Sequence, residues 1–332
     1  GLRPVRGILS IALAAREKGF TGLIIPEANA KEAIRVENLE VYGAKNLSQV
    51  VDFLRFGKGL APTVSQLTKA KEDLTGPTPP DFAEVKGQET VKRSLEIAAA
   101  GGHNVLMVGP PGSGKSMLAK RLPTILPPMS NAEALEVTRI HSVAGELPEN
   151  SSFLIQRPFR SPHHTTSAAA LLGGGAYPMP GEISLAHNGV LFLDELPEFK
   201  RRVLEVLRQP LEERRITISR TRAKVTYPSS FMLIASMNPS PDGLFPVQGS
   251  DSSPTYLAKR YVSKISGPLL DRIDLHIEVQ AVPYEKLSSE SDNESSHSIR
   301  AVSYTHLTLP TTSALCRSGW GPCRGIWGGG GG

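Results

Sequence analysis

Short apolar runs alternate with segments of helical periodicity over the middle of the chain. Residues 88–100 have the spacing of an amphipathic helix and end at a pair of glycines. Continuous apolar runs follow at 105–108, 190–193 and 231–235, and residues 275–279 alternate between apolar and polar side chains. Continuous runs of this length are typical of strands that are buried on both faces of a parallel sheet. The pattern therefore predicts an α/β domain with three layers, in which helices cover both faces of a parallel sheet.

The N-terminal part of the chain has shorter signals. Helical spacing and strand-like runs alternate in the order helix, strand, helix, strand, helix, at residues 8–15, 22–26, 28–34, 39–42 and 49–54. The sequence that follows is polar and rich in proline and glycine, which predicts a linker that its prolines stiffen. We therefore expect a small α+β unit that is separated from the main domain.

The same patterns predict the domain boundaries. The α+β unit, the linker, the main domain and a C-terminal tail fall at residues 1–56, 57–81, 82–283 and 284–332. The sequence after Ala301 shows neither helical nor strand periodicity, and it ends in a run of glycines. We expect the tail to be non-native or disordered.

Composition changes this picture little. The formal net charge is +5 and the pI is near 9.2, which is compatible with nucleic acid as a partner but also typical of a solvated basic surface. No run approaches the roughly 18 apolar residues of a membrane helix, and the first residues lack the apolar region of a signal peptide. We therefore expect a cytoplasmic protein without membrane contact. Both cysteines, Cys316 and Cys323, lie near the C-terminus, which excludes thiolate zinc sites and a disulfide framework elsewhere.

A glycine-rich loop directly follows the strand predicted at 105–108. Its residues are Gly109, Pro110, Pro111, Gly112, Ser113, Gly114, Lys115 and Ser116, and helical spacing resumes behind it. Between a strand and a helix, this spacing is typical of a phosphate-binding loop rather than of a chance turn. Backbone N–H groups would then surround the phosphates of ATP, Lys115 would reach the β- and γ-phosphates, and Ser116 would offer its hydroxyl to Mg²⁺.

Three polar residues follow the next predicted strands. Asp194 ends the strand at 190–193, at the edge of the sheet where ligands bind in such folds, so we expect it to bind Mg²⁺. Glu195 is placed to polarise the attacking water. Asn238 follows the strand at 231–235, and its amide can orient that water, although an asparagine before proline also forms turns. Lys115, Glu195 and Asn238 are therefore predicted catalytic residues.

Residues 82–280 resemble the AAA+ domain of the ComM/YifB family, the magnesium-chelatase-like ATPases. Besides the phosphate loop, the matching stretches are 87–88, 98–104, 157–165, 180–187, 189–199 and 266–274. The resemblance implies an AAA+ P-loop fold, ATP and Mg²⁺ as cofactors, and a homo-hexameric ring with ATP between subunits. Arg272 matches the arginine finger of related groups and would act on the neighbouring subunit's ATP. A surface pair of Arg272 with Asp271 or Asp274 is the alternative.

Residues 1–56 resemble the remainder of that family's N-terminal domain, which is similar to the proteolytic domain of Lon. Segment 3–9 aligns with the Lon stretch that carries the catalytic lysine, and Leu9 occupies that position. The part that would carry the serine nucleophile lies upstream of residue 1. The resemblance therefore implies a truncated Lon-protease-like α+β domain without peptidase activity.

A hairpin pattern at 216–227 is one candidate for the lining of the ring's pore. Its alternation predicts that Arg220, Arg222 and Lys224 lie on one face. Repeated around a pore, this face would suit the phosphate backbone of DNA. A solvated hairpin face is an equal alternative.

The second candidate for the pore is an insert around residues 153–179. It carries Arg157, Arg160, His163 and His164. Two histidines can suggest a metal, but a third ligand is not evident, so substrate contact or packing is favoured. We expect no zinc.

Two departures from the family pattern bear on function. Residues 240–245 contain no cysteine where many relatives carry a cluster, and the helical lid that supplies a second arginine is not recognisable after residue 284. A DNA motor for branch migration or strand displacement in recombination of foreign DNA is the first hypothesis, and the basic hairpin favours it. A chelatase-type or protein-remodelling ATPase is the second, and a nucleotide-binding fragment without turnover is the third.

Overall fold

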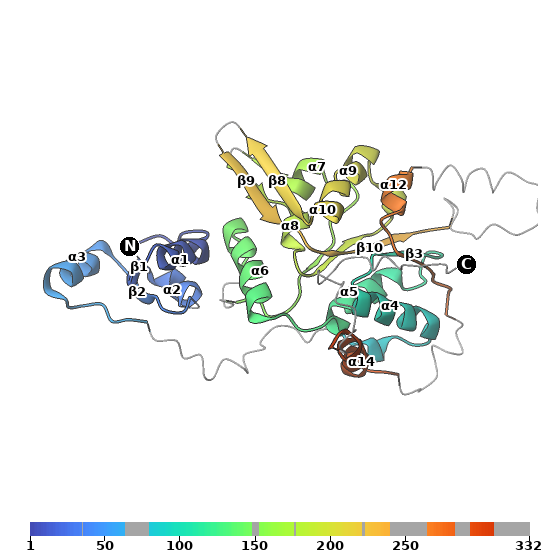
Figure 1. Ribbon diagram of the computed structural model, residues 1–332, viewed down its shortest axis with the longest axis horizontal. Helices are drawn as coiled ribbons and strands as arrows, with labels where there is room; N and C mark the ends of the chain where they lie inside the picture. The colour runs from blue at the N-terminus through green and yellow to red at the C-terminus, as the bar shows by residue number, and fades with distance from the viewer. Residues whose placement is uncertain are drawn as a thin grey trace, which may run out of the picture.

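A five-stranded parallel sheet forms the centre of the protein (Figure 1). The computed structural model describes residues 1–34, 36–63, 80–147, 153–175, 177–220, 223–239, 264–282 and 293–308. The strand order is β11–β3–β10–β7–β4. The bounds are Val105–Val108 for β3, Phe159–Arg160 for β4, Val190–Leu193 for β7, Met232–Met237 for β10 and Leu275–Glu278 for β11. The parallel sheet predicted from the apolar runs is confirmed.

Side chains of these strands alternate between two cores. Leu106, Leu191 and Leu233 point into one core, while Met107 and Phe192 point into the other. Helices α7, α8, α9 and α12 contribute to the first core, at Ala168–Leu172, Glu182–Leu185, Arg201–Glu205 and Gly267–Leu270. Helices α4, α5 and α14 contribute to the second, at Glu89–Gly101, Lys115–Ile125 and Ser296–Thr308. The predicted three-layer α/β/α arrangement is therefore present.

Helix α14 departs from the expectation of a disordered tail. Its first residue is tied to the main domain, because the Ser296 hydroxyl accepts from the N–H of Phe82 and from Thr124 Oγ1, each at 2.8 Å. The Ser296 N–H donates to Asp81 Oδ1 at 2.8 Å. Ile299 is buried in the core shared with α4 and α5. Residues 293–308 thus differ in the structure from the expected disorder, and the long-range contacts that hold them leave no periodic pattern in the sequence.

The N-terminal unit is a two-stranded parallel sheet with three helices. Its elements are α1, β1, α2, β2 and α3, at Ile8–Glu17, Gly22–Pro26, Glu27–Ala33, Glu40–Ala44 and Leu47–Phe56. They match the predicted order of helices and strands. Leu9 is fully buried in this unit. The likeness to Lon and the domain boundaries stay predictions.

Helix α6, Asn131–Ala144, joins the N-terminal unit to the main domain (Figure 1). A capping box starts it, since Ser130 and Glu133 each satisfy the other's backbone N–H. Ser142 faces the N-terminal unit. Its carbonyl oxygen accepts a hydrogen bond from the Gly7 N–H at 3.2 Å, and its hydroxyl donates to the Glu32 carboxylate. On the other side, His141 Nε2 donates to Leu185 O in α8 at 3.0 Å.

The predicted hairpin is present as β8, Arg215–Arg220, and β9, Ala223–Pro228, but the expected common face of its cations is not. Arg220 pairs with Ala223, and Lys224 pairs with Ser219. Facing residues of an antiparallel pair share one side of the ribbon, and neighbours along a strand point to opposite sides. Arg220 therefore lies on the side of buried Ile218, and Lys224 lies on the other side. The register of the two strands therefore separates these two cations, and Arg222 lies outside the described residues.

In the ranges that the structure describes, no helix is both long and apolar enough to cross a membrane. Residues 240–245 are not among those ranges, and of the predicted linker only 57–63 and 80–81 are. Thr63 in the first of these parts donates its N–H to Val41 O in β2 at 2.7 Å. The start of the predicted linker is thus held against the N-terminal unit.

Candidate nucleotide site

The glycine-rich loop connects β3 to α5 at the carboxyl edge of the sheet. A Cβ at Gly109 would lie 2.1 Å from the carbonyl oxygen of Val279, so the close approach of these two backbones requires glycine. Gly112 and Gly114 have φ angles of 76° and 90°, a region that glycine adopts readily. Helix α5 begins at Lys115 directly after the loop. Loop N–H groups and a helix N-terminus therefore come together at one place, as phosphate binding requires.

Lys115 lies under this loop with 8% of its surface exposed. Its ammonium donates to the carbonyl oxygens of Gly109 and Pro110, at 2.7 and 2.8 Å. It also donates to Asn238 Oδ1 at 3.3 Å. Burial lowers the pKa of Lys115, and the carboxylates of Asp194 and Glu195 act in the opposite direction. The structure thus brings Lys115 and Asn238 together as the sequence predicted.

The second half of the site is at the end of β7. Ser116 Oγ donates to Asp194 Oδ2 at 2.7 Å, which joins the loop to this strand. Ser236 in β10 donates its hydroxyl to the other oxygen, Asp194 Oδ1. Because β3, β7 and β10 are parallel, their carboxyl ends meet at one edge of the sheet. The predicted pair Ser116 and Asp194 is therefore in contact.

Glu195 follows Asp194 with a φ of 53°, in the left-handed region that non-glycine residues rarely adopt. Its N–H donates to Asp194 Oδ1 at 3.1 Å and to Ser236 Oγ at 3.3 Å. Its side chain is 55% exposed. Such a backbone costs about 1–3 kcal/mol and persists where neighbouring contacts hold it, often at functional sites. The exposed carboxylate is therefore presented from a fixed backbone.

Two residues of the site were not singled out from the sequence. Ser236 is fully buried and holds both Asp194 and the Glu195 N–H. In the sequence, the feature that could have identified Ser236 is that it is a hydroxyl residue within the otherwise apolar strand β10. Gln88 precedes α4, and its amide donates to Ser113 O at 3.3 Å and to Gln280 O at 2.7 Å. It therefore fastens the loop to the segment after β11.

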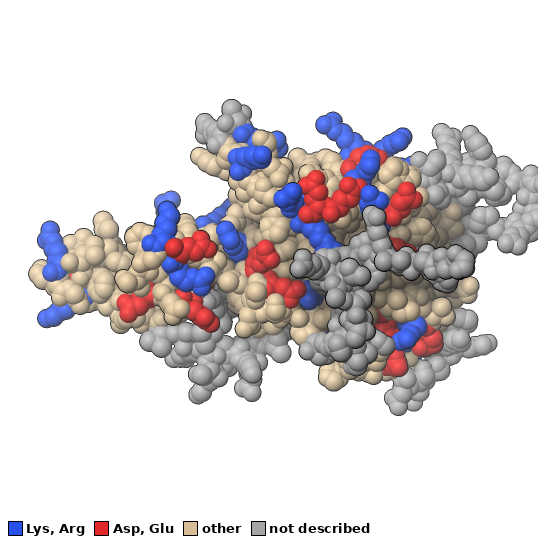
Figure 2. Space-filling model, in the orientation of Figure 1, with Lys and Arg blue, Asp and Glu red and all other residues tan. Residues whose placement is uncertain are grey.

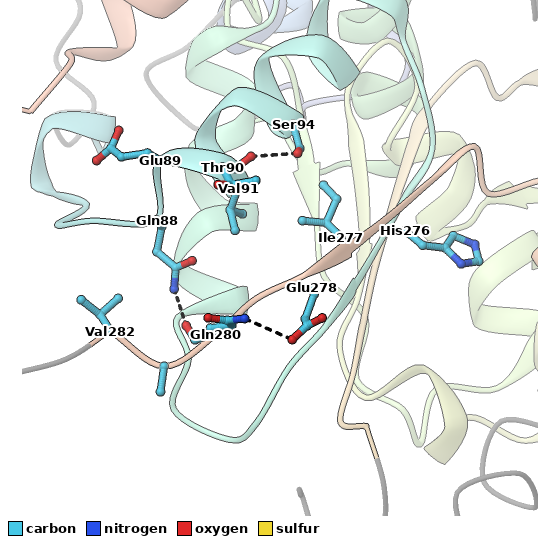
Figure 3. Close-up of a pocket in the computed structure, with 11 residues that line it drawn as sticks. Gln88, Glu89, Thr90, Val91, Ser94, His276, Ile277, Glu278, Gln280 and Val282 are labelled. Carbon is cyan, nitrogen blue, oxygen red and sulfur yellow. Dashed lines mark hydrogen bonds between the residues drawn. The ribbon is translucent and has the colours of Figure 1, made fainter. Parts of the chain in front are cut away.

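A pocket of about 510 Å³ lies beside the loop, between the start of α4 and the edge strand β11 (Figure 3). Gln88 spans one end of it and reaches toward Gln280. Val91 and Ile277 contribute apolar walls, and Glu278 contributes a carboxylate. Gln88 lines this pocket and also donates to Ser113 O, so one side chain links the pocket wall to the phosphate loop.

Arg272 lies at the other end of the sheet. Its carbonyl oxygen accepts from Asn104 Nδ2 at 2.8 Å, and Asn104 immediately precedes β3. The glycine-rich loop follows β3, so Arg272 and the loop are at opposite ends of that strand. Its guanidinium pairs with Glu212 of α10, Arg208–Glu213, at 2.7 Å rather than with Asp271 or Asp274. Arg272 is therefore not part of its own chain's loop cluster.

The cations of the hairpin are also apart from the loop. Figure 2 shows basic side chains on the hairpin and a mixture of both signs over the remainder of that face. Arg220 and Lys224 are both exposed. A Cβ at Gly174 would lie 2.8 Å from an Arg220 guanidinium nitrogen, so this arginine packs on the small ribbon of β5, Gly173–Gly174, and β6, Met179–Pro180.

The residues present fit Mg²⁺ and a nucleoside triphosphate. The hydroxyl of Ser116 and the carboxylate of Asp194 are oxygen donors in contact, which is the chemistry that Mg²⁺ prefers. A Cβ at Gly112 would meet nothing within 4 Å, so the loop has open space on its outer side. Lys115 supplies a cation directly beneath the loop. The donor set therefore suits phosphate oxygens and a divalent cation together.

Comparisons with known proteins agree with this geometry. Residues 81–287 match the family described as magnesium chelatase, subunit ChlI. The chain is 47% identical over 302 residues to the competence protein ComM of Haemophilus influenzae, covering 90% of this chain and 58% of that protein. It is 48% identical over 301 residues to the uncharacterized protein YifB of Salmonella typhimurium, with the same coverage. It is 26% identical over 219 residues to the magnesium-chelatase 38 kDa subunit of Cereibacter sphaeroides, covering 60% of this chain and 58% of that protein.

The chain thus spans 58% of the length of its ComM and YifB relatives. The family match covers most of the main domain, including the glycine-rich loop, Asp194, Glu195 and Arg272. Together with the P-loop α/β fold, it establishes that the chain belongs to the magnesium-chelatase-like AAA+ ATPase family of the ComM and YifB proteins.

Proposed function

We propose that the chain is an ATP-hydrolysing motor subunit that acts on DNA, in branch migration or strand separation during recombination of foreign DNA. The observation that carries ATP hydrolysis is the cluster at the carboxyl edge, where Ser116 Oγ lies 2.7 Å from Asp194 Oδ2 and Glu195 follows. The DNA part is supported by the exposed hairpin cations and by the relative that is named a competence protein. Cytoplasmic action belongs to the same proposal.

Each residue of the cluster would have its own role in ATP binding and hydrolysis. Mg²⁺-bound ATP supplies the phosphoanhydride bond and a compensating positive charge. Loop N–H groups and Lys115 hold the phosphate oxygens, and the Lys115 ammonium exchanges its loop carbonyl partners for them. Ser116 and Asp194 hold the cation, and the Ser236 hydroxyl keeps Asp194 in place.

Glu195 and Asn238 would act on the attacking water. The Glu195 carboxylate takes up the proton of that water, and its restrained backbone limits the directions that the side chain can adopt. Asn238 Oδ1 is within 3.3 Å of the Lys115 ammonium, so its amide can contact the same γ-phosphate and orient the water. The pocket beside Gln88 would take the base and ribose.

Assembly into a homo-hexameric ring is part of this proposal. Arg272 lies at the amino edge of the sheet and is 44% exposed, so it is accessible to a neighbouring subunit. We propose that it supplies positive charge to the phosphates bound at the neighbour's loop. Its pair with Glu212 is exposed on both sides and is therefore weak, so release costs little.

Two measurements on the protein at its natural length test the proposal. ATPase activity is expected to rise with branched or single-stranded DNA, and more strongly at low salt, because phosphate contacts release counterions. Glu195→Gln is expected to keep nucleotide binding and to lower kcat on the order of 10³-fold. Unchanged kcat in Glu195→Gln would remove this residue from its role.

ATP hydrolysis that is indifferent to DNA at every salt concentration would rule out the DNA part alone. It would favour a chelatase-type or protein-remodelling ATPase, to which the 26% identity with the magnesium-chelatase 38 kDa subunit points. Nucleotide binding without turnover in the wild-type protein would favour the third hypothesis, a nucleotide-binding fragment.

A further inference from the structure

Asn104 forms hydrogen bonds in several directions at the amino edge of the sheet, directly before β3. Its side-chain oxygen accepts from the N–H of Leu233 in β10 at 2.9 Å, and its side-chain nitrogen donates to Arg272 O at 2.8 Å. Its backbone N–H donates to Asp274 Oδ2 at 2.8 Å, and its carbonyl oxygen accepts from the Leu275 N–H at 3.1 Å. One residue therefore joins β3, β10 and the segment that enters β11.

The direction of the Asn104 amide is fixed by the sheet. Leu233 is fully buried, and a buried backbone N–H needs an acceptor, which the Asn104 side-chain oxygen supplies. The amide nitrogen must then point the other way, where it meets the carbonyl oxygen of Arg272. Strand β3 itself lies between β11 and β10 in the sheet. The bond to Arg272 therefore originates from a residue that is held firmly on the other side.

The backbone of Arg272 is also held, while its guanidinium is not held firmly. The Arg272 N–H donates to Leu269 O of α12 at 3.1 Å, and the next residue, Ile273, is buried in the core. The guanidinium pairs with Glu212, but both side chains are 44% exposed, and exposed ion pairs of this kind contribute little. The position from which the guanidinium extends is therefore set by its backbone contacts, among them the bond from Asn104.

We propose that Asn104 is a positioning residue for Arg272, which fixes the arginine to β3 so that its guanidinium is presented to the phosphates of the neighbouring subunit. The four residues of β3 separate Asn104 from Gly109, the first residue of the phosphate loop. One short strand would thus set the spacing between a subunit's own loop and the arginine that it offers to the next subunit. The inference rests on the proposed function, because the action of Arg272 on a neighbour belongs to it.

The test starts from Asn104→Asp in the protein at its natural length. This change keeps an acceptor for the Leu233 N–H and removes the donor to Arg272 O. We expect kcat to fall about 10- to 100-fold, because a displacement of about 1 Å in a charged group is costly, while the affinity for a fluorescent ATP analogue stays within about twofold. Asn104→Ala should behave alike. His103→Ala is the control and should match the wild type, because His103 approaches the same segment at Asp274, at 3.8 Å.

Mixing subunits separates positioning of the arginine from damage to the loop or to the fold. An Asn104→Asp subunit keeps its own loop and presents a displaced arginine. It should regain ATPase activity with Lys115→Ala, which supplies a correctly placed Arg272, and gain nothing with Arg272→Ala. In an Arg272→Ala background, Asn104→Asp should change kcat less than twofold, because the arginine that it positions is absent.

Several results would overturn the inference and leave the proposed function intact. These are a wild-type kcat in both Asn104 variants, an equal loss in His103→Ala, and recovery of Asn104→Asp by Arg272→Ala, since the first subunit would then supply a working arginine. Recovery by neither partner would also overturn it, in favour of a general role in folding. If Lys115→Ala and Arg272→Ala fail to restore each other, the proposed action of Arg272 on its neighbour fails, and this inference fails with it.

Discussion

The two edges of the central sheet carry different chemistry. At the carboxyl edge, groups from β3, β7 and β10 are joined to one another, with Ser116, Asp194 and Ser236 in one hydrogen-bonded chain. At the amino edge, Arg272 is bound through its backbone to Asn104, and its guanidinium pairs with Glu212, which is also exposed. The first edge brings together most groups of the candidate site, while the second presents the exposed cation of Arg272.

The difference follows from the geometry of parallel strands. All five strands end at the same edge, so polar residues that follow apolar runs converge there without any special arrangement. A cation that precedes β11 is at the other end by the same rule. A chain built this way places the phosphate site and Arg272 on opposite edges. In the proposed ring, one subunit's amino edge would meet the next subunit's carboxyl edge.

The largest effect is expected at the carboxyl edge. Lys115→Ala removes the cation beneath the loop, and we expect turnover to fall on the order of 10³-fold or more together with the loss of nucleotide binding. Binding of a fluorescent ATP analogue and phosphate release measure the two losses. Lys120→Ala is the control, because Lys120 is an exposed lysine of the same helix. Undiminished hydrolysis in Lys115→Ala would refute the site.

The next effect tests the amino edge. Arg272→Ala is expected to lower kcat on the order of 10²–10³-fold while nucleotide binding is kept, because its charge acts on the neighbour's phosphates. Arg208→Ala, which removes an exposed arginine of α10 that pairs with Glu205, is the control.

Mixing two inactive variants sharpens the comparison of the edges. A Lys115→Ala subunit keeps Arg272, and an Arg272→Ala subunit keeps its own loop. If Arg272 acts in trans, a mixture of the two regains part of the ATPase activity. A mixture as inactive as each variant alone would contradict the assignment of Arg272 to the neighbouring site.

A smaller effect is expected at the hairpin. Lys224→Ala should weaken DNA binding and make the slope of log affinity against log salt shallower by about 0.7–0.9, the value for one phosphate contact. Arg215→Ala is the control at the base of the hairpin, where it pairs with Glu213. The slopes are measured by fluorescence anisotropy. Equal slopes for the wild type, Lys224→Ala and Arg215→Ala would show that the hairpin is a solvated surface without a DNA contact.

The smallest effect concerns stability rather than either edge. Burial lowers the pKa of His141 below its ordinary value of 6.5, although its bond to Leu185 O opposes this. As the pH falls, the histidine therefore takes up its proton at a higher pH in the unfolded chain than in the folded protein. The free energy of unfolding should fall as the pH drops below about 6.5, by up to about 1.4 kcal/mol per pH unit for this group. Thermal unfolding of His141→Gln should show a weaker dependence. The same dependence in both proteins would assign it to other groups, among them the buried His187.

Several features could be predicted from the sequence because they depend on local rules. Apolar runs place strands, so β3, β7, β10 and β11 fall within two residues of their predicted bounds. Glycines with positive φ and the lysine and serine behind them specify the phosphate loop without reference to the remainder of the chain. Asp194 and Glu195 follow from their place at a strand end.

Other features depended on the tertiary structure, because they join residues that are distant in the sequence or that follow a turn. In the register of β8 and β9, Arg220 pairs with Ala223 and Lys224 pairs with Ser219, so the two cations lie on opposite faces of the hairpin. Helix α14 is held by contacts of Ser296 with Phe82 and Thr124, which leave no periodic pattern. The contact of His164 with Glu195 exists only because β4 pairs with β7. The sequence by itself determined which groups are candidates to bind phosphate and Mg²⁺, because the loop and the strand ends are local features. The packing of the sheet decided which other side chains surround them.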